Sequence, residues 1–139
     1  MEIYFHSEDL DFELQNTQDI VTWINDTAKA ENYVVETINY IFCSDMYLLG
    51  VNRQYLNHDY YTDIITFDYN EDNRIVGDLF ISIDRVKDYA QNNQINFKDE
   101  LNRVMIHGVL HLCGYPDKSE EEAKLMRSKE EFYLNLRKF

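Results

Sequence analysis

The sequence is poor in basic residues and in cysteine, and both scarcities narrow what the protein can be. Its 13 Lys and Arg residues face 26 Asp and Glu residues, which gives a formal net charge of −13. Tight binding of free RNA over a broad surface is therefore disfavoured, because phosphate contacts depend on Lys and Arg. The two cysteines, Cys43 and Cys113, are too few for a disulfide framework and suit a reducing compartment.

Long apolar runs are also missing from the sequence. No stretch is long enough to predict a membrane span, and no Lys or Arg precedes Lys29, so the basic start of a signal peptide is not seen. We therefore expect a cytoplasmic protein with no membrane partner. A length of 139 residues fits one domain with a sizeable core, and we expect residues 1–139 to form that single domain.

The order of apolar and turn-forming residues predicts strands mixed with helices. Alternating or β-branched stretches predict strands at 3–5, 34–43, 64–69 and 77–83. Helical spacing predicts helices at 18–31, 45–55, 84–91, 97–112 and after Ser119. The expected caps are Thr17 for the first of these helices and Asp45 for the second, and Ser119 is expected to form a capping box with Glu122 at the last. This mixture in a short chain indicates the α+β class, with a mixed sheet and helices packed against it. In the last helix, the residues expected to dock on the core are Leu125, Met126, Phe132 and Leu136.

The most informative stretch lies at the end of the helix predicted for 97–112. His107 and His111 are four positions apart, so both imidazoles project from one helix face about one turn apart. Gly114 ends the helix and Pro116 prevents its continuation, so the chain can turn back and bring Asp117 toward the imidazoles. We expect these three residues to hold one metal ion on the helix and the following turn.

A site made of two histidines and one carboxylate favours catalytic zinc. Such sites usually have three protein ligands and leave a position for water, whereas structural zinc is usually closed by four ligands that are rich in cysteine. Cys113 stands two residues past His111 and faces away from it on a helix, so we assign it to packing.

The residues around this site resemble the signature of the YbeY family, bacterial metal-dependent endoribonucleases linked to ribosomal RNA maturation and ribosome quality control. The resemblance rests on His-Gly-x-Leu-His-Leu-x-Gly-Tyr at 107–115 and implies a zinc site. In that family a third histidine normally stands two residues beyond the Tyr, after an Asp. Here those positions hold Pro116 and Asp117, which keeps the ligand count but adds a negative charge that should make bound water less acidic.

A second stretch, residues 51–67, is similar to another part of the family pattern. The matching residues are Asn52, Tyr55, Asp59, Thr62, Asp63 and Phe67. The family's Arg in this stretch aligns with Leu56, so Arg53, one helical turn earlier, is a candidate RNA contact; a solvated surface Arg is the alternative. The resemblance covers roughly residues 50–130 and implies the same fold class.

These observations favour a metal-dependent endoribonuclease that acts on single-stranded ribosomal RNA. A bound metal ion would activate water or stabilise charge at phosphorus, and Asp63 or Glu100 is a candidate to relay a proton. Glu100 lies two turns before His107, too far to be a ligand. RNA as the substrate is implied by the resemblance, as is a ribosomal subunit or ribosomal protein as a partner that could offset the acidic surface.

Two alternatives stay open at the level of sequence. A metallopeptidase would need a general base beside the first histidine, as in His-Glu-x-x-His, and Gly108 stands there. Gly108 either lets a sugar-phosphate chain approach the ligands or lets the helix pack closely. A ribosome-associated binding protein with structural zinc is the other alternative, with His58 as a possible fourth ligand.

Overall fold

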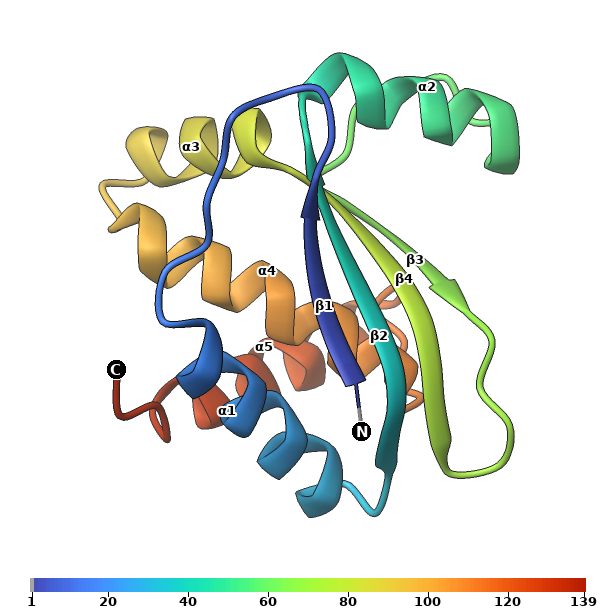
Figure 1. Cartoon of the computed structure of the whole chain (residues 1–139), viewed down its shortest axis with the longest axis vertical. Coiled ribbons are helices and arrows are strands. Elements are labelled where there is room, and N and C mark those ends of the chain that lie inside the picture. Colours follow the sequence, from blue (N-terminus) through green and yellow to red (C-terminus); the bar gives the residue numbers. More distant parts are fainter. Residues whose placement is uncertain (1) are drawn as a thin grey trace.

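The computed structural model describes residues 2–139, which form a four-stranded mixed sheet and five helices (Figure 1). The elements are β1 (Glu2–Ser7), α1 (Thr17–Ala30), β2 (Val34–Cys43), α2 (Asp45–Leu56), β3 (Ile64–Asp68), β4 (Arg74–Ser82), α3 (Ile83–Asn92), α4 (Phe97–Leu112) and α5 (Glu120–Leu134). The predicted α+β class is confirmed. Among the described residues, no helix is long and apolar enough to cross a membrane.

The strand order in the sheet is β1-β2-β4-β3. β1 and β2 run parallel, β2 and β4 run parallel, and β3 returns antiparallel to β4, so the sheet is mixed as expected. A parallel pair needs a crossover, and α1 supplies the one between β1 and β2. β3 therefore forms an edge of the sheet.

The main core lies between the sheet and the helices α1, α3, α4 and α5, which cover one of its faces (Figure 1). α4 is the central helix of this layer and buries most of its side chains, including Val104, Met105 and Val109. A smaller cluster packs α2 against β3 and includes Leu48 of α2 and Ile65 of β3. α4, which carries His107 and His111, thus buries a larger share of its residues than any other helix of the described fold.

Helix ends show where local sequence rules were imprecise. The position before α1 is Asn16 and the cap of α2 is Ser44, whereas the sequence favoured Thr17 and Asp45. The Ser44 hydroxyl accepts the backbone N–H of Tyr47, which is the usual capping bond. Asp45 instead pairs with Arg85, at 2.6 Å from Oδ2 to Nη2.

The last helix docks differently from the prediction. α5 begins after the Ser119–Glu122 capping box, as expected, and Met126 is buried. The prediction that Leu125, Phe132 and Leu136 also dock was wrong, since all three are exposed. The buried face of α5 is set instead by longer-range partners: Glu130 pairs with Arg103 of α4, and the carbonyl of Tyr133 accepts the indole N–H of Trp23 at 2.8 Å.

Gly108 lies where α4 crosses the sheet. A Cβ at this position would come within 2.9 Å of Ile64 Cδ1 and 3.0 Å of Leu79 Cδ2. Of the two roles left open for Gly108, close packing of the helix on the sheet is the one that the structure supports.

We predict that Gly108→Ala lowers stability relative to Gly50→Ala by about 1–3 kcal/mol, the usual cost of overpacking. Both glycines lie inside helices and gain the same helix propensity from Ala, but a Cβ at Gly50 meets nothing within 4 Å. Urea unfolding of both variants measures the difference. Equal free energies of unfolding would contradict the packing role of Gly108.

Candidate metal centre

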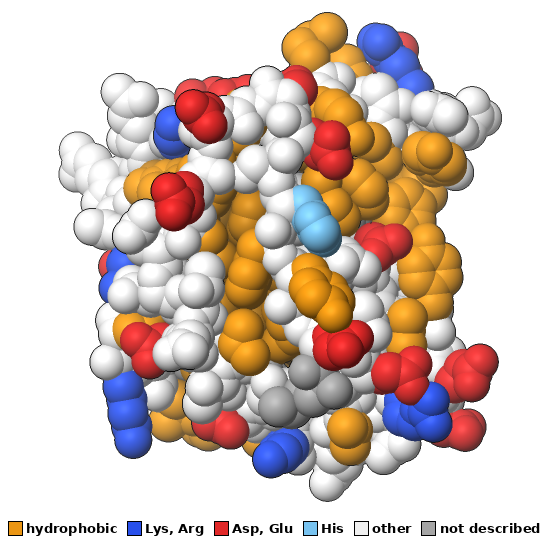
Figure 2. All heavy atoms as spheres, viewed as in Figure 1, with side chains coloured by type: hydrophobic (Ala, Val, Ile, Leu, Met, Phe, Trp, Pro, Cys, Tyr) orange, Lys and Arg blue, Asp and Glu red, His pale blue; other side chains and the backbone are white. Residues whose placement is uncertain are grey.

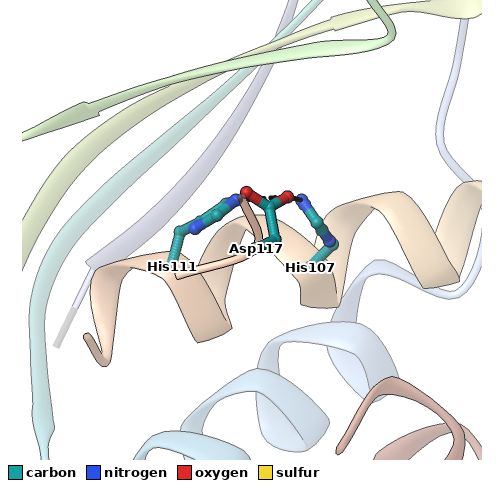
Figure 3. Close-up of side chains that lie close together, drawn as sticks. All are labelled: His107, His111 and Asp117. Atoms are coloured by element: carbon teal, nitrogen blue, oxygen red, sulfur yellow. Dashed lines mark ion pairs between the residues drawn. The ribbon is translucent and has the colours of Figure 1, made fainter. Parts of the chain in front are cut away.

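The end of α4 reverses the chain in a way that the sequence predicted. Gly114 has a φ of 95°, its N–H donates to the carbonyl of His111, and the N–H of Tyr115 donates to the carbonyl of Leu110. This is the Schellman arrangement, in which Gly takes the left-handed conformation that other residues rarely adopt. The reversal brings Asp117 back over the helix face that holds His107 and His111 (Figure 3).

Three ligand atoms converge at this point. Nε2 of His107 and Nε2 of His111 each lie 3.3 Å from Oδ2 of Asp117, and one ligand atom of each residue lies within 4.8 Å of the others. Tetrahedral zinc with bonds of about 2.0–2.1 Å holds its ligand atoms about 3.3 Å apart. A charge-assisted hydrogen bond would be shorter, at about 2.7–2.9 Å. The two distances to Asp117 therefore fit ligands of one metal ion better than they fit ion pairs.

Both imidazoles are oriented by an acceptor at their other nitrogen. Nδ1 of His107 lies 2.5 Å from Oε2 of Glu130, and Nδ1 of His111 lies 2.9 Å from the carbonyl oxygen of Tyr115. These acceptors assign the proton to Nδ1, which leaves the lone pair on Nε2. Two lone pairs and a carboxylate oxygen then face one another, and a cation held between them would relieve their repulsion. The donor set fits a zinc ion.

A buried group of charges holds Glu130 in place. The Arg103 guanidinium contacts Glu130 at 3.0 Å and grips the Glu100 carboxylate with two bonds, of 2.8 and 2.6 Å. Burial opposes ionisation of Glu130, but the hydrogen bond from His107 and the charge and hydrogen bond of Arg103 outweigh it and hold the pKa of Glu130 below its usual value. Glu130 is therefore an ionised acceptor for His107 Nδ1.

The cluster forms part of the wall of a cavity of about 570 Å³. The remaining wall comes from α2, the loop after it and β3, with Leu56, His58, Tyr60 and Asp63 among its residues. Lys118, next to Asp117, is the one Lys or Arg residue that lines the cavity within the described range 2–139. His107, His111 and Asp117 thus face a cavity large enough to admit part of another molecule.

The structure places the other candidate residues differently. Asp63 lines the cavity, with Oδ2 3.9 Å from Nη2 of Arg103. Glu100 does not reach it: its side chain is 2% exposed and held by Arg103. Arg53 also lies outside the cavity wall and pairs with Asp59. His58 lines the cavity but is not a member of the three-residue cluster.

Sequence reasoning missed a second carboxylate that braces this region. Glu31, at the end of α1, accepts hydrogen bonds from the hydroxyls of Tyr115 (2.6 Å) and Tyr133 and from Lys129 Nζ at 3.2 Å. It therefore ties α1 and α5 to the turn whose carbonyl orients His111. Burial raises the pKa of Glu31, but these donors overcome that effect and lower it. No local motif indicates the roles of Glu31 and Glu130, because the histidine and the tyrosines that they contact lie 23 to 102 residues away in sequence.

Two histidines and a carboxylate beside an open cavity, on an α+β scaffold, form the kind of site that metal-dependent hydrolases use. A family model described as endoribonuclease YbeY matches residues 2–138. The chain belongs to this family. The match extends well beyond the 50–130 region in which the resemblance was seen.

Individual relatives agree with this assignment. A protein named endoribonuclease YbeY from Cytophaga hutchinsonii is 56% identical over 138 residues, covering 99% of this chain and 96% of the relative. One of the same name from Flavobacterium psychrophilum is 50% identical, covering 92% and 91%. A solution structure of a Thermotoga maritima protein superposes with a TM-score of 0.68 at 26% identity, covering 96% of this chain and 87% of that one.

We predict that Glu130→Gln weakens zinc binding about 10- to 100-fold, the usual effect of changing the partner behind a ligating histidine, because an amide oxygen is an uncharged and weaker acceptor than a carboxylate. Competition with a chromophoric chelator measures the affinity. Glu131→Gln is the matched control, because Glu131 is the exposed neighbour on α5. Equal affinities in both variants, at unchanged thermal stability, would show that Glu130 does not orient His107.

We predict that Glu31→Gln lowers the free energy of unfolding by about 1.5–3 kcal/mol at pH 7, the value of hydrogen bonds to a charged group. Because the pKa of Glu31 is lowered by folding, its stabilisation is complete above the ordinary value of 4.5 and is lost as the pH falls through the folded value.

Urea unfolding at several pH values checks this. The gap between wild type and Glu31→Gln should narrow below pH 4.5, whereas the exposed control Glu121→Gln should show no gap. A gap that is independent of pH would mean that the charge of Glu31 is unimportant.

Proposed function

We propose that this chain is a zinc-dependent endoribonuclease that cuts single-stranded ribosomal RNA during ribosome maturation in the cytoplasm, with residues 1–139 acting as one catalytic domain. The observation that supports it most is the convergence of His107, His111 and Asp117 beside a cavity, with both imidazoles 3.3 Å from the Asp117 carboxylate and all three ligand atoms within 4.8 Å of one another. Membership of a family described as endoribonuclease YbeY supports RNA as the substrate class.

The residues of the cavity have separate tasks in this proposal. A bound zinc ion would polarise a phosphoryl oxygen and make water more acidic. Asp63 accepts the proton from the attacking water, whose oxygen bonds to phosphorus as the bond to the leaving oxygen breaks; the leaving oxygen takes its proton from solvent. Lys118 contacts a non-bridging phosphate oxygen. Glu100 acts from outside the cavity, because it fixes Arg103 and through it Glu130.

RNA must reach this cavity on an acidic protein. Figure 2 shows the Lys and Arg side chains of one face lying apart from one another, so no basic stripe runs across that face. Lys118 and the metal ion are thus the local attraction for phosphate. Arg53 is exposed and paired with Asp59 at the outer side of α2, so its contact with RNA would lie outside the cavity. A ribosomal subunit or ribosomal protein would deliver the substrate.

The two alternatives fit the structure less well. A metallopeptidase base next to His107 would stand at Gly108, which packs against Ile64 and Leu79 and does not line the cavity. A closed structural site would need a fourth ligand. Among residues 2–139 the metal-ligand cluster has three members, and the ring of His58 is engaged with Tyr60.

We predict that the zinc-loaded protein cleaves a single-stranded ribosomal RNA fragment and not casein, and that His111→Ala and Asp117→Ala each reduce the rate on the order of 100-fold or more. The assay follows labelled RNA on denaturing gels. Asp88→Ala, which removes an exposed carboxylate on α3, is prepared in the same way as a control and should keep full activity.

Equal cleavage by all four proteins would reveal a contaminating nuclease. Chelation should abolish cleavage while the circular dichroism spectrum stays folded, since a metal that merely holds the fold together would unfold the protein on removal. Unfolding on chelation, with no cleavage in any sample, would favour the binding-protein alternative.

A further inference from the structure

An aromatic pair lies on the wall of the cavity that also holds the metal cluster. The rings of His58 and Tyr60 are stacked, with centroids 5.1 Å apart and an interplanar angle of 22°, and the Tyr60 hydroxyl lies 3.0 Å from Nδ1 of His58. Tyr60 is nevertheless 55% exposed. The two rings cover each other on one side, and more than half of the Tyr60 surface stays exposed next to the cavity.

Hydrogen bonds to Asn52 of α2 hold the loop that carries this pair. α2 ends at Leu56, and Asn57 takes a left-handed conformation that turns the chain. Asn52, buried at 1% exposure, donates its side-chain N–H to the carbonyl of Tyr60 at 2.9 Å, and its own carbonyl accepts the N–H of His58 at 3.1 Å. Asn52 therefore positions both His58 and Tyr60.

Neighbouring tyrosines already have partners, and Tyr60 differs from them. The hydroxyl of Tyr61 contacts the sulfur of Met46, and its ring lies under the guanidinium of Arg85 at 5.1 Å. Tyr55 packs edge-on against Phe67. Neither Tyr55 nor Tyr61 lines the cavity. The exposed aromatic surface of Tyr60 is thus left available on the substrate side.

We propose that the His58–Tyr60 pair is the platform on which an unpaired base of the substrate stacks, next to the phosphate that is cleaved. This inference rests on the proposed endoribonuclease function and names what selects its substrate. Aromatic side chains stack on any base because every base has a π-face, so the platform tolerates sequence. A base in a duplex is already paired and stacked. The platform therefore favours single strands.

The test combines a protein change with a substrate change. Tyr60→Ala should lower kcat/KM about tenfold, mainly through KM, the size of one lost base–aromatic stack. Tyr60→Phe should keep most of the activity. In the wild type, an abasic nucleotide placed at each position flanking the mapped cleavage site should lower kcat/KM about tenfold at one position. In Tyr60→Ala the same abasic substrate should cause no further loss.

Tyr69→Ala is the matched control, because Tyr69 has the same 55% exposure but does not line the cavity. It should behave as the wild type with every substrate. A penalty for the abasic substrate that is as large in Tyr60→Ala as in the wild type would overturn the platform. Thermal unfolding of each variant verifies that it folds.

A binding readout separates failure of the platform from failure of the nuclease proposal. 2-Aminopurine at the affected position, or at each position in turn when no cleavage occurs, should be quenched within the first seconds of mixing by wild type and Tyr69→Ala, and not by Tyr60→Ala. Quenching without cleavage would refute the nuclease and support the platform. Cleavage with quenching that is unchanged in Tyr60→Ala would refute the platform alone.

Discussion

The hydrogen bonds at the outer nitrogens of two histidines decide how the candidate site works. Glu130 and the Tyr115 carbonyl each hold one Nδ1, so both Nε2 atoms turn toward the oxygen of Asp117. Without these acceptors the imidazoles would be free to rotate and to protonate on either nitrogen. These acceptors come from α5 and from the turn after α4, so the packing of α5 on α4 keeps them in place.

Buried charge sustains this arrangement in an acidic protein. Glu100, Arg103 and Glu130 form a chain of ion pairs between α4 and α5, in which one guanidinium serves two carboxylates. Such a group is costly to desolvate and contributes little net stability. Its value lies in geometry: it fixes the rotation of α5 relative to α4, and therefore the distance from Glu130 to His107. The exposed apolar residues of α5 follow from the same constraint, because docking is governed by Glu130 and Tyr133.

The sequence predicted much of the local structure and few of the long-range contacts that hold the candidate site in place. α4 spans 97–112 as expected, because periodicity and the Gly114 stop are local signals. The convergence of His107, His111 and Asp117 was predictable for the same reason, and the assignment of Cys113 to packing is confirmed by its burial. Glu31, Glu130 and the cap at Ser44 were missed. Each depends on a partner or a competing side chain that helical spacing does not reveal.

The turn after α4 has a consequence for how the family can vary. Gly114 and the two backbone hydrogen bonds around it determine where residue 117 stands, and the side chain of residue 117 takes no part in forming the reversal. Position 117 can therefore hold an imidazole or a carboxylate without a change in the turn that places it. A single substitution at residue 117 would thus change the charge of the candidate centre, and with it the acidity of any water that a metal ion binds there.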